Sequence, residues 1–494
     1  MLNLFIWIPA LGAAFIAFCP EKQASRLSPQ FARWTAFAVA IAMFVWSIIL
    51  GSHSELFNSD WQFQEYIPWL ETLGINYHLG IDGLSLPLLI LNGFLTSIAI
   101  YSTNPRTHRP RLYYTLILLL NGGVAGAFLA QDLLLFFLFY EVELIPLYLL
   151  IAIWGGERRE YAATKFLICT AISGIFILAA FLGLIGFSGA SSFAYNPALS
   201  SVLPLGTQIA LLVAILIGFA VKTPLVPFHT WLPDAHVEAS TPVSILLAGV
   251  LLKLGTYGFL RFGLGLFPEA WSVLAPWLAT WAVVSVLFGV LVAIAQQDMK
   301  KMVAYSSIGH MGYILLAAAA ATPVSLMGAV LQMVSHGLIA ALLFLLVGLI
   351  YDKTGTRDSE ILKGLLNPEQ GFAVVGSLMI LAVMASAGIP GMAGFVAEFL
   401  CFQGSFSVFP VQTLLCMIGT GLTAVYFVML INRVFFGRIC AVIGDLPKVK
   451  WTESIPAVIL AIAIVLIGIQ PGWLIGKTEA TTTTMLEQFV IRNS

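Results

Sequence analysis

The chain has 494 residues, of which 60% are hydrophobic and only 10% are charged. Soluble globular domains carry about 25% charged residues, so this composition excludes that class and indicates a protein that crosses the membrane many times. The formal net charge of -1, without a basic tract, gives no indication of a nucleic-acid partner.

Apolar segments long enough to cross a bilayer recur along the whole chain. A spanning helix needs about 20 mostly apolar residues, and on this criterion the sequence predicts an all-α membrane protein of about fourteen helices. Residues 52–83, between the second and third helices, are expected to form a short acidic loop, and no segment is left for a soluble domain. The expected helices lie near 2–20, 32–51, 84–102, 112–130, 132–154, 163–187, 208–230, 242–264, 272–296, 302–321, 325–350, 371–403, 408–436 and 454–474.

Basic residues alternate between the loops in step with this helix count. Most lysines and arginines fall in loops that follow odd-numbered helices, whereas the opposite side holds only Arg261, Lys477 and Arg492. The positive-inside rule then predicts that the odd-numbered loops face the cytoplasm and that both termini face the lumen. The odd-numbered loops hold Lys22, Arg26, Arg33, Arg106, Arg109, Arg111, Arg158, Arg159, Lys165, Lys300, Lys301, Lys353, Arg357, Lys363, Arg433, Arg438, Lys448 and Lys450.

A small set of ionisable side chains falls inside the expected helices. A lysine at the centre of a spanning helix costs about 2.5–3.5 kcal/mol, so residues of this kind usually mark an ion path and pair with one another. We therefore take the set as candidates for a proton path. Its members are Glu141, Glu143, Lys222, Lys253, His310, His336 and Glu398.

Two of these candidates, Glu141 and Glu143, are separated by a single residue. On a regular helix they point in different directions, so at most one is expected to face a given partner. We favour Glu141 as the functional carboxylate and expect Glu143 to serve packing or to meet a loop arginine. A carboxylate paired with a buried lysine stabilises both charges, and moving a proton onto either group changes the attraction by several kcal/mol. Such a pair can act as a switch.

The helix that carries Lys222 is expected to break directly after it. Pro224 and Pro227 remove backbone donors, and a broken helix at membrane depth is tolerated only where it lines protein or water. In transporters such breaks mark the ion path. The alternative is a kinked structural helix whose lysine reaches the surface.

A polar segment with His229, Asp234, His236 and Glu238 follows this break. Its spacing is not that of a helical two-histidine metal site, so we predict no metal and expect a gate or a polar plug at the cytoplasmic end of the path. The five cysteines also lack metal-type spacing and are expected to pack as small apolar residues.

The two histidines in the expected helices, His310 and His336, have two readings of similar weight. Lone histidines are often satisfied core residues. Two on consecutive helices, in a chain with 7 in all, favour a proton relay because the imidazole titrates near neutral pH.

A second break is expected within 371–403. Gly388, Pro390 and Gly391 interrupt the apolar stretch, and Glu398 follows about one to two turns later. A break beside an ionisable residue in each half predicts two related units, formed by the fourth to eighth and the ninth to thirteenth helices. Because each unit has an odd number of spans, the second unit starts on the opposite side of the membrane and is inverted relative to the first. The expected divisions are 1–111, 112–264, 265–436 and 437–494.

Five segments carry long, specific motifs: FYEVELIPLYLL (139–150), the stretch 220–255, AYSSIGHMGY (304–313), LQMVSHGL (331–338) and IPGMAGFVAEF (389–399). They resemble the antiporter-like membrane subunits of respiratory complex I, most of all the subunit-4 type. The resemblance covers essentially the whole chain. Glu398 matches this type, whereas sister subunits carry lysine there, and the chain ends soon after the fourteenth expected helix, unlike the subunit-5 type.

The resemblance implies one proton-translocating subunit of a complex I-type (NDH-1) NAD(P)H or ferredoxin:plastoquinone oxidoreductase. Protons would reach Lys222, paired with Glu141, pass along Lys253 and the histidines, and leave at Glu398. The chain itself would hold no redox cofactor, and the quinone site and iron–sulfur clusters would belong to other subunits. The implied neighbours are subunits of the 5, 2, 4L and 6 types, in a cyanobacterial thylakoid membrane.

The motifs leave a few alternatives open. The segments HVEASTPVSILL (236–247) and GIPGMAGF (388–395) differ from the usual photosynthetic form and resemble the variants found with carbon dioxide-hydration subunits. A multi-subunit sodium/proton antiporter of the same superfamily would carry similar motifs. A scaffold that has lost transport is a third alternative, but the retained charged set argues against it.

Overall fold

The computed structural model of the protein describes residues 1–18, 29–52, 61–367, 372–438 and 448–493. Among the residues discussed above, Cys19, Lys22, Arg26 and Cys440 and the side chain of Arg492 lie outside the described part.

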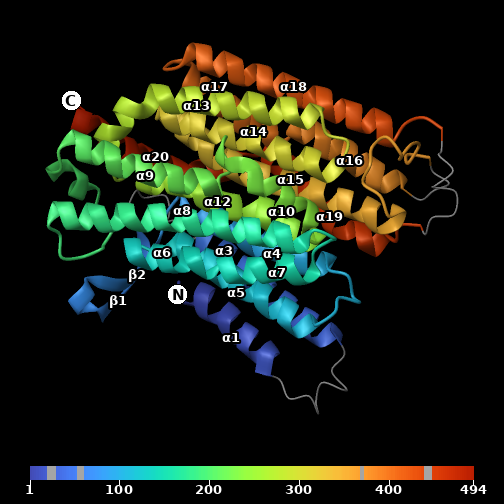
Figure 1. The fold of residues 1–494 in the computed structure, drawn as a ribbon, viewed down its shortest axis with the longest axis horizontal. Helices are drawn as coiled ribbons and strands as arrows, with labels where there is room; N and C mark the ends of the chain where they lie inside the picture. The colour runs from blue at the N-terminus through green and yellow to red at the C-terminus, as the bar shows by residue number, and fades with distance from the viewer. Residues whose placement is uncertain (19–28, 53–60, 368–371, 439–447, 494) are drawn as a thin grey trace.

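One bundle of long, roughly parallel and antiparallel helices makes up the molecule (Figure 1). The described residues contain 12 helices long and apolar enough to cross a membrane, together with two shorter apolar ones. Many large apolar side chains on the outer helices are exposed, among them Trp7, Phe15 and Ile175, as expected of a surface that meets lipid. The predicted polytopic helical fold is therefore confirmed.

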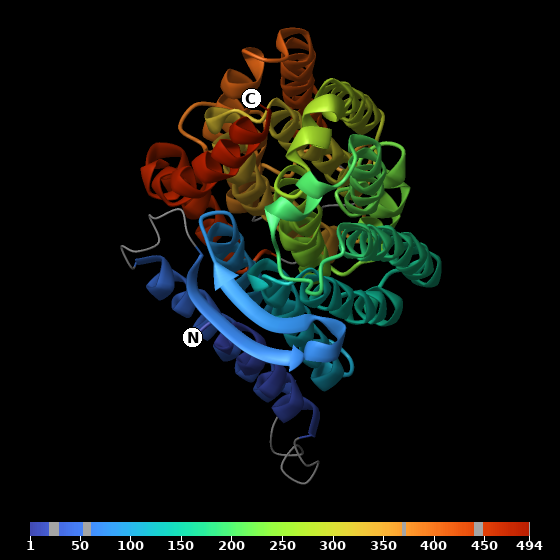
Figure 2. The ribbon, with the colours of Figure 1, turned by 90° about the vertical axis from the view of Figure 1, so that its left-hand side faces the viewer.

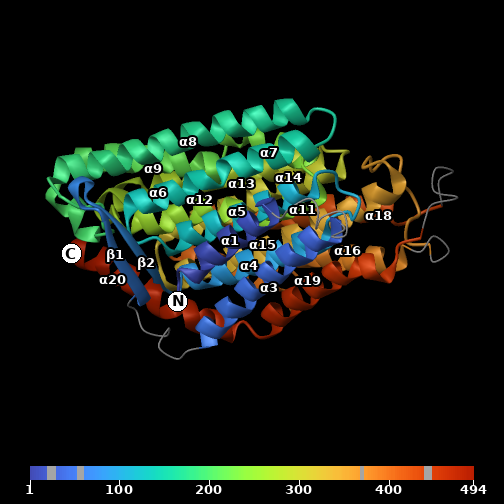
Figure 3. The same ribbon diagram turned by 90° about the horizontal axis from the view of Figure 1, so that it is seen from below.

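The first helices flank the bundle on one side. In Figure 3 they lie along its lower part, beside the last spanning helix. They pack on the beginning of the next unit, where α1 contacts α5 (Pro110–Leu129). These flanking helices are α1 (Leu4–Phe18), α3 (Pro29–Ser52) and α4 (Ser85–Ser102).

A β-hairpin occupies part of the segment that the sequence assigned to an acidic loop. Strands β1 (Gln62–Leu70) and β2 (Ile75–Ile81) pair antiparallel and lie across one end of the bundle, which faces the viewer in Figure 2. A short helical turn, η2 (Glu71–Leu73), joins them and ends at Gly74, whose φ of 69° favours glycine. We call this end of the molecule the hairpin end.

The first unit packs against these helices and ends in a span at the centre of the bundle. That span, Thr241–Leu264, is entirely buried and contains two π-helical segments, a feature common at functional sites. The elements are α5 (Pro110–Leu129), α6 (Leu133–Val142), α7 (Leu144–Trp154), α8 (Arg159–Ser188), η3 (Pro197–Val202), α9 (Leu205–Lys222), η4 (Phe228–Thr230), α10 (Trp231–Glu238), α11 (Thr241–Leu246), η5 (Leu247–Leu251), α12 (Leu252–Gly258) and η6 (Phe259–Leu264).

The second unit continues the bundle to its opposite edge. Its longest helix, α15, lies centrally and packs against α11, α14 and α17. The elements are α13 (Pro268–Ile294), α14 (Met299–Ala320), α15 (Pro323–Thr354), α16 (Ala373–Ser386), α17 (Ala393–Phe406), α18 (Pro410–Val434) and then α19 (Trp451–Ile469). The proposed divisions between the units stay a prediction.

An additional helix, α20 (Gly472–Asn493), follows the fourteenth span, where the sequence predicted only a short tail. It packs against α13 and α15 and reaches the hairpin end, where the Thr481 hydroxyl accepts a hydrogen bond from the Gly83 amide at 2.9 Å. Its sequence is too polar to be recognised as a span, because threonines and charged residues interrupt the apolar positions.

Both predicted helix breaks are present. Helix α9 ends at Lys222, and α16 ends at Ser386, with six residues between it and the start of α17 at Ala393. A further break, at Glu143 between α6 and α7, was not predicted. Pro146 explains it, because a proline without an N–H group is accepted in the first turn of a helix but not in its interior.

The loops opposite the hairpin carry basic residues and lie together. Arg106, Arg158 and Arg357 come from three separate loops and Lys301 from the first turn of α14, yet they line one cavity of about 1050 Å³. The charge alternation in the sequence therefore matches the direction of the helices. We call this end the basic end.

Candidate proton path

Lys222 lies at the end of α9 and is only 1% exposed. Its ammonium group forms a buried ion pair with the Glu143 carboxylate and lies 5.0 Å from the centre of the Tyr140 ring. The alternative of a lysine that reaches the surface is therefore wrong, because the side chain points into the protein.

The carboxylate that contacts Lys222 is Glu143, not Glu141 as the sequence suggested. The assignment assumed a continuous helix, but the chain breaks at Glu143 and α7 starts at the next residue. The signal was present in Pro146, three residues later, which places Glu143 at the start of a new helix.

Glu141 lies on the other side of the same break, against α8. A Cβ atom at Gly174 would collide with its carboxylate, so the glycine makes the room that the side chain occupies. Its Oε1 atom is buried without a hydrogen-bond partner among the described residues. Lys222 still interacts electrostatically with Glu141, so one lysine is influenced by two carboxylates.

The break after Lys222 is supported by side chains that use the freed backbone groups. The Trp231 indole donates to the Val221 carbonyl at 2.8 Å, and the Val226 amide donates to the Ser285 hydroxyl at 3.2 Å. Because buried backbone groups without partners are costly, these contacts hold the irregular segment at membrane depth.

Lys253 lies in the central span and is fully buried. Its ammonium group is 2.8 Å from Nδ1 of His336 and donates to the Ala248 carbonyl at 2.6 Å. Ala248 belongs to the π-helical segment η5, where irregular hydrogen bonding leaves a carbonyl that can face a side chain.

The two histidines continue the line from Lys253 into the second unit. The rings of His336 and His310 are 5.4 Å apart between centres. Nδ1 of His310 lies 3.3 Å from a Glu398 carboxylate oxygen, and its Nε2 lies 3.1 Å from the Ser386 hydroxyl. The two-sided polar contacts favour a relay over a core residue that packs alone.

The second break positions Glu398 at the far end of this line. Gly388 has a φ of 69°, and a Cβ there would lie 3.2 Å from the Glu398 carboxylate. Glu398 also accepts a hydrogen bond from the Thr420 hydroxyl of α18 at 2.9 Å. The turn formed by Gly388, Pro390 and Gly391 thus brings the end of one half-helix beside the carboxylate of the next.

The polar segment predicted after Lys222 does not form one cluster. Asp234 pairs with Lys165 at 2.7 Å, and Glu238 accepts from the Arg158 amide at 2.9 Å. His229 packs against the Phe288 ring with 4.8 Å between centres. In the described part of the chain, no group of three or more His, Cys, Asp or Glu residues has metal-site geometry.

His236 is the member of this segment that lies deepest. It is fully buried and stacks on Phe344, with ring centres 4.3 Å apart, and neither ring nitrogen has a hydrogen-bond partner among the described residues. Burial, together with the charges of Lys300 and Lys253, holds the pKa of His236 well below its usual value. The ring is therefore neutral at neutral pH and lies within electrostatic range of both lysines.

Lys300 lies between the cavity at the basic end, which it lines, and His236, on which its charge acts. It lines that cavity but is only 4% exposed, and it donates to the Ala239 carbonyl at 2.6 Å. The sequence placed it in a loop, because it falls between the expected helices 272–296 and 302–321, whereas α14 already begins at Met299. Its burial depends on loops distant in the sequence, so the local pattern gave no signal of it.

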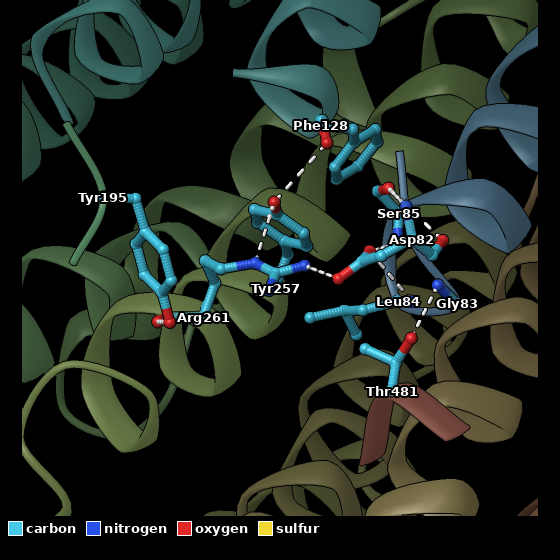
Figure 4. A network of polar contacts seen from close by, with 9 residues as sticks. All are labelled: Asp82, Gly83, Leu84, Ser85, Phe128, Tyr195, Tyr257, Arg261 and Thr481. Atoms are coloured by element: carbon cyan, nitrogen blue, oxygen red, sulfur yellow. Dashed lines mark hydrogen bonds and ion pairs between the residues drawn. The ribbon is translucent and has the colours of Figure 1, made fainter. Parts of the chain in front are cut away.

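Arg261 is a second basic residue that was expected in a loop but is buried. It lies in η6, is 4% exposed, and pairs with Asp82 at the hairpin end. Figure 4 shows this pair together with Tyr257 and Tyr195. Among the described residues, no hydrogen bond or ion pair joins this pair to a predicted member of the path.

Together these groups form a line of side chains that can take up and release protons. Lys253, His336, His310 and Glu398 cross from the central span of the first unit to the broken helix of the second. No hydrogen bond or ion pair joins Lys222 to Lys253 in the described part of the chain. The Lys222–Glu143 ion pair is therefore not part of this line of contacts.

Comparisons with known proteins identify the family to which the chain belongs. The family model described as "NADH:quinone oxidoreductase/Mrp antiporter, TM" matches residues 130–423. A relative named NAD(P)H-quinone oxidoreductase chain 4 2, from Thermosynechococcus vestitus, is 40% identical over 98% of this chain and 91% of its own length. Chain 4-3 from Nostoc sp. is 42% identical over 88% of this chain and 78% of its own.

Solved structures share the fold. A chain of respiratory complex I from Thermus thermophilus with bound NADH superposes with a TM-score of 0.88 at 26% identity, covering 99% of this chain and all of that one. A chain of the Mrp complex from Dietzia sp. superposes with a TM-score of 0.87 at 20% identity over 99% of this chain and 98% of its own, a likeness of fold alone. The chain therefore belongs to the NADH:quinone oxidoreductase/Mrp antiporter family of membrane subunits, and its nearly full-length similarity at about 40% identity is to chain 4 members.

Proposed function

We propose that this chain translocates protons as a membrane subunit of an NDH-1, or complex I-type, NAD(P)H–quinone oxidoreductase. The observation that carries the proposal is the buried line Lys253–His336–His310–Glu398, in which each group can both bind and release a proton. Intramembrane ionisable groups of this kind are costly and serve ion paths. Relatives named as chain 4 of this enzyme match nearly the whole chain.

In this proposal the Lys222–Glu143 pair acts as the switch. Two opposite charges about 4 Å apart attract by about 4 kcal/mol at an effective dielectric constant of about 20. A conformational or charge change that separates the pair raises the free energy of both buried charges. The field felt by the neighbouring line then changes, and with it the proton affinity of Lys253.

Protons reach the line from the cavity at the basic end. Lys300 lines that cavity, and His236 lies within electrostatic range of Lys300 and Lys253. Because its pKa is low, His236 would hold a proton only transiently while the proton passes from the Lys300 side toward Lys253. This differs from the sequence expectation of uptake at Lys222, because the cavity and His236 lead toward Lys253. Release follows at Glu398.

Electron transfer takes place elsewhere in the assembly. We expect the quinone site and iron–sulfur clusters in other subunits, and neighbours of the 5, 2, 4L and 6 types in the membrane arm. We place the assembly in a cyanobacterial thylakoid membrane, with the basic end in the cytoplasm. The departures at 236–247 and 388–395 favour a form that also binds carbon dioxide-hydration subunits.

A sodium/proton antiporter is the competing function. Its support is the likeness to a chain of an Mrp complex at 20% identity, which concerns the fold. The similarity to chain 4 relatives is higher, at 40% over 98% of the chain. This difference favours the quinone oxidoreductase.

The test is proton uptake by the purified complex in sealed vesicles, measured per quinone reduced. Lys253→Met removes the titratable group but keeps the length of the side chain, so we expect proton uptake to fall strongly while quinone reduction continues in the presence of an uncoupler. Replacement of the exposed Lys450 by Met serves as the control. A normal proton-to-electron ratio in Lys253→Met would contradict the proposal.

A further inference from the structure

The pair of Asp82 and Arg261 forms the centre of a closed network at the hairpin end (Figure 4). The Arg261 guanidinium bonds Asp82 Oδ2 through one nitrogen and donates from Nε to the Tyr257 hydroxyl at 3.2 Å. The other carboxylate oxygen, Oδ1, accepts from the amides of Leu84 and Ser85 at 3.1 and 2.9 Å. Both oxygens of Asp82 are therefore engaged.

Aromatic rings enclose the guanidinium. Its central carbon lies 4.2 Å from the centre of the Trp61 ring, 5.4 Å from Tyr257 and 5.7 Å from Tyr195. Arg261 is 4% exposed and Asp82 also 4%. Cation–π contacts and exclusion of water make such a cluster rigid.

Two residues of the cluster, Tyr257 and Arg261, lie on the same continuous helix as Lys253 of the proposed path. Lys253 and Tyr257 are four residues apart in α12 and so lie on one face, and Arg261 contacts the Tyr257 hydroxyl. This face leads from the path toward the hairpin end. Without a barrier, it offers a proton at Lys253 a short way out of the first unit.

Arginine is suited to stop a proton on this face. A chain of groups that passes protons needs members that can both accept and donate, whereas guanidinium is donor-only and stays protonated. Its fixed positive charge also repels an excess proton, as arginines do in pores that exclude protons. The Tyr257 hydroxyl proton is directed to the Phe128 carbonyl at 3.4 Å, away from Arg261.

We propose that the Asp82–Arg261 cluster is a proton barrier that closes the hairpin end of the first unit. With this exit closed, a proton at Lys253 can move only toward His336 and Glu398. Arg261 thereby sets the direction of translocation without lying on the path. The inference rests on the proposed function, because it assumes that Lys253 carries protons.

The test measures passive proton leak through the intact complex in vesicles, without an electron donor. Arg261→Gln removes the fixed charge and gives the site a group that can accept as well as donate. We expect a proton leak several-fold above that of the unchanged complex and a lower proton-to-electron ratio. The double variant Arg261→Gln/Lys253→Met should return the leak to the original level, because the leak passes through Lys253.

A second variant keeps the test decisive where Arg261→Gln fails to assemble. Trp61 is only partly buried, so Trp61→Ser opens the ring cage to water at small structural cost, and we expect a leak that Lys253→Met again suppresses. Tyr66→Ser, at an exposed hairpin aromatic residue, is the matched control and should not leak.

Two results would overturn the barrier. One is an unchanged leak in both Arg261→Gln and Trp61→Ser complexes that are fully assembled. The other is a leak that persists after Lys253→Met, which would reflect general loosening of the fold. Failure of the proposed function itself is seen separately, as a normal donor-driven proton-to-electron ratio in the Lys253→Met complex.

Discussion

At the scale of single residues, Lys222 has two carboxylates nearby but only one in contact. Glu143 forms the ion pair, and Glu141 interacts from beyond the break. The two residues therefore differ in what their removal leaves behind. Loss of Glu143 leaves a buried ammonium without a partner, whereas loss of Glu141 removes a more distant charge.

This difference makes Glu143→Gln the more damaging substitution. Breaking a buried ion pair by removing one partner costs about 3–5 kcal/mol, so we expect most of the donor-driven proton uptake to be lost in Glu143→Gln and a smaller part in Glu141→Gln. Proton uptake per quinone reduced, measured on both variants with equal amounts of assembled complex, checks this. Equal losses would mean that the pair is exchanged between the two carboxylates during turnover.

Two adjacent lysines at the basic end allow a matched comparison of the uptake site. Lys300 is 4% exposed and donates to Ala239, whereas its neighbour Lys301 is only partly buried. We expect Lys300→Met to slow proton uptake several-fold, because the cavity then ends in an apolar side chain. Lys301→Met should leave the rate near its original value.

The readout is the initial rate of proton uptake at saturating electron donor. Quinone reduction with an uncoupler present reports whether the complex is intact. If Lys300→Met and Lys301→Met have the same small effect, uptake does not pass Lys300, and the role of His236 would have to be tested by itself with His236→Phe.

At the scale of elements, the breaks in the helices place the charged groups. Lys222 ends α9, Glu143 lies at the break between α6 and α7, and Glu398 lies in the second turn of α17, after the second break. Helix ends leave backbone groups free and carry partial charge. The broken helices therefore do two things at once: they aim the side chain and they supply polar backbone beside it.

The second break offers a test with two glycines of similar backbone conformation. Gly388 and Gly391 have φ of 69° and 89°, so alanine is strained at both, by about 1–2 kcal/mol. Only at Gly388 would the new Cβ approach the Glu398 carboxylate, at 3.2 Å, while Gly391 faces open space. We expect Gly388→Ala to reduce proton uptake clearly more than Gly391→Ala.

Thermal stability of the complex separates strain from displacement of Glu398. The two variants should lose similar stability, and only Gly388→Ala should lose pumping beyond that. Equal pumping in both would show that Glu398 tolerates a shift of a few tenths of an ångström.

The same elements show what the sequence could and could not predict. Prolines and glycines after Lys222 and around Gly388 predicted two breaks correctly, because these residues act on their own backbone. Pro146 indicates a break at Glu143 in the same way, but it lies inside a long apolar run, 132–154, that we interpreted as one continuous helix. The hairpin was missed because its strands lack clear alternation of apolar and polar residues and lie in a segment taken as an acidic loop.

At the scale of the whole molecule, burial depends on contacts between distant segments. Arg261 and Lys300 were both counted among the loop charges in the alternation of basic residues. Arg261 is buried by Trp61 and Tyr195 from other parts of the chain, and Lys300 by the segment around Ala239. A pattern along the sequence cannot report such contacts, whereas the helix count and direction follow from it well.

The complete line of groups from Lys253 to Glu398 works in series if the proposed path is correct. A block at either end then stops the same flow, so the effects of two blocks on pumping do not add. We expect Lys253→Met, Glu398→Gln and the double variant to show the same loss of proton uptake per quinone reduced. Effects on folding stability add instead, because the two sites lie in different elements, α12 and α17.

The comparison also tests whether a parallel route exists through the Lys222 region. If the double variant loses clearly more proton uptake than either single variant, protons reach the release side by two routes, and Lys222 carries protons as well as switching. Lys222→Met added to Lys253→Met then distinguishes the two roles: a carrier adds a further loss, whereas a switch acting only through Lys253 adds none, because its target is already absent.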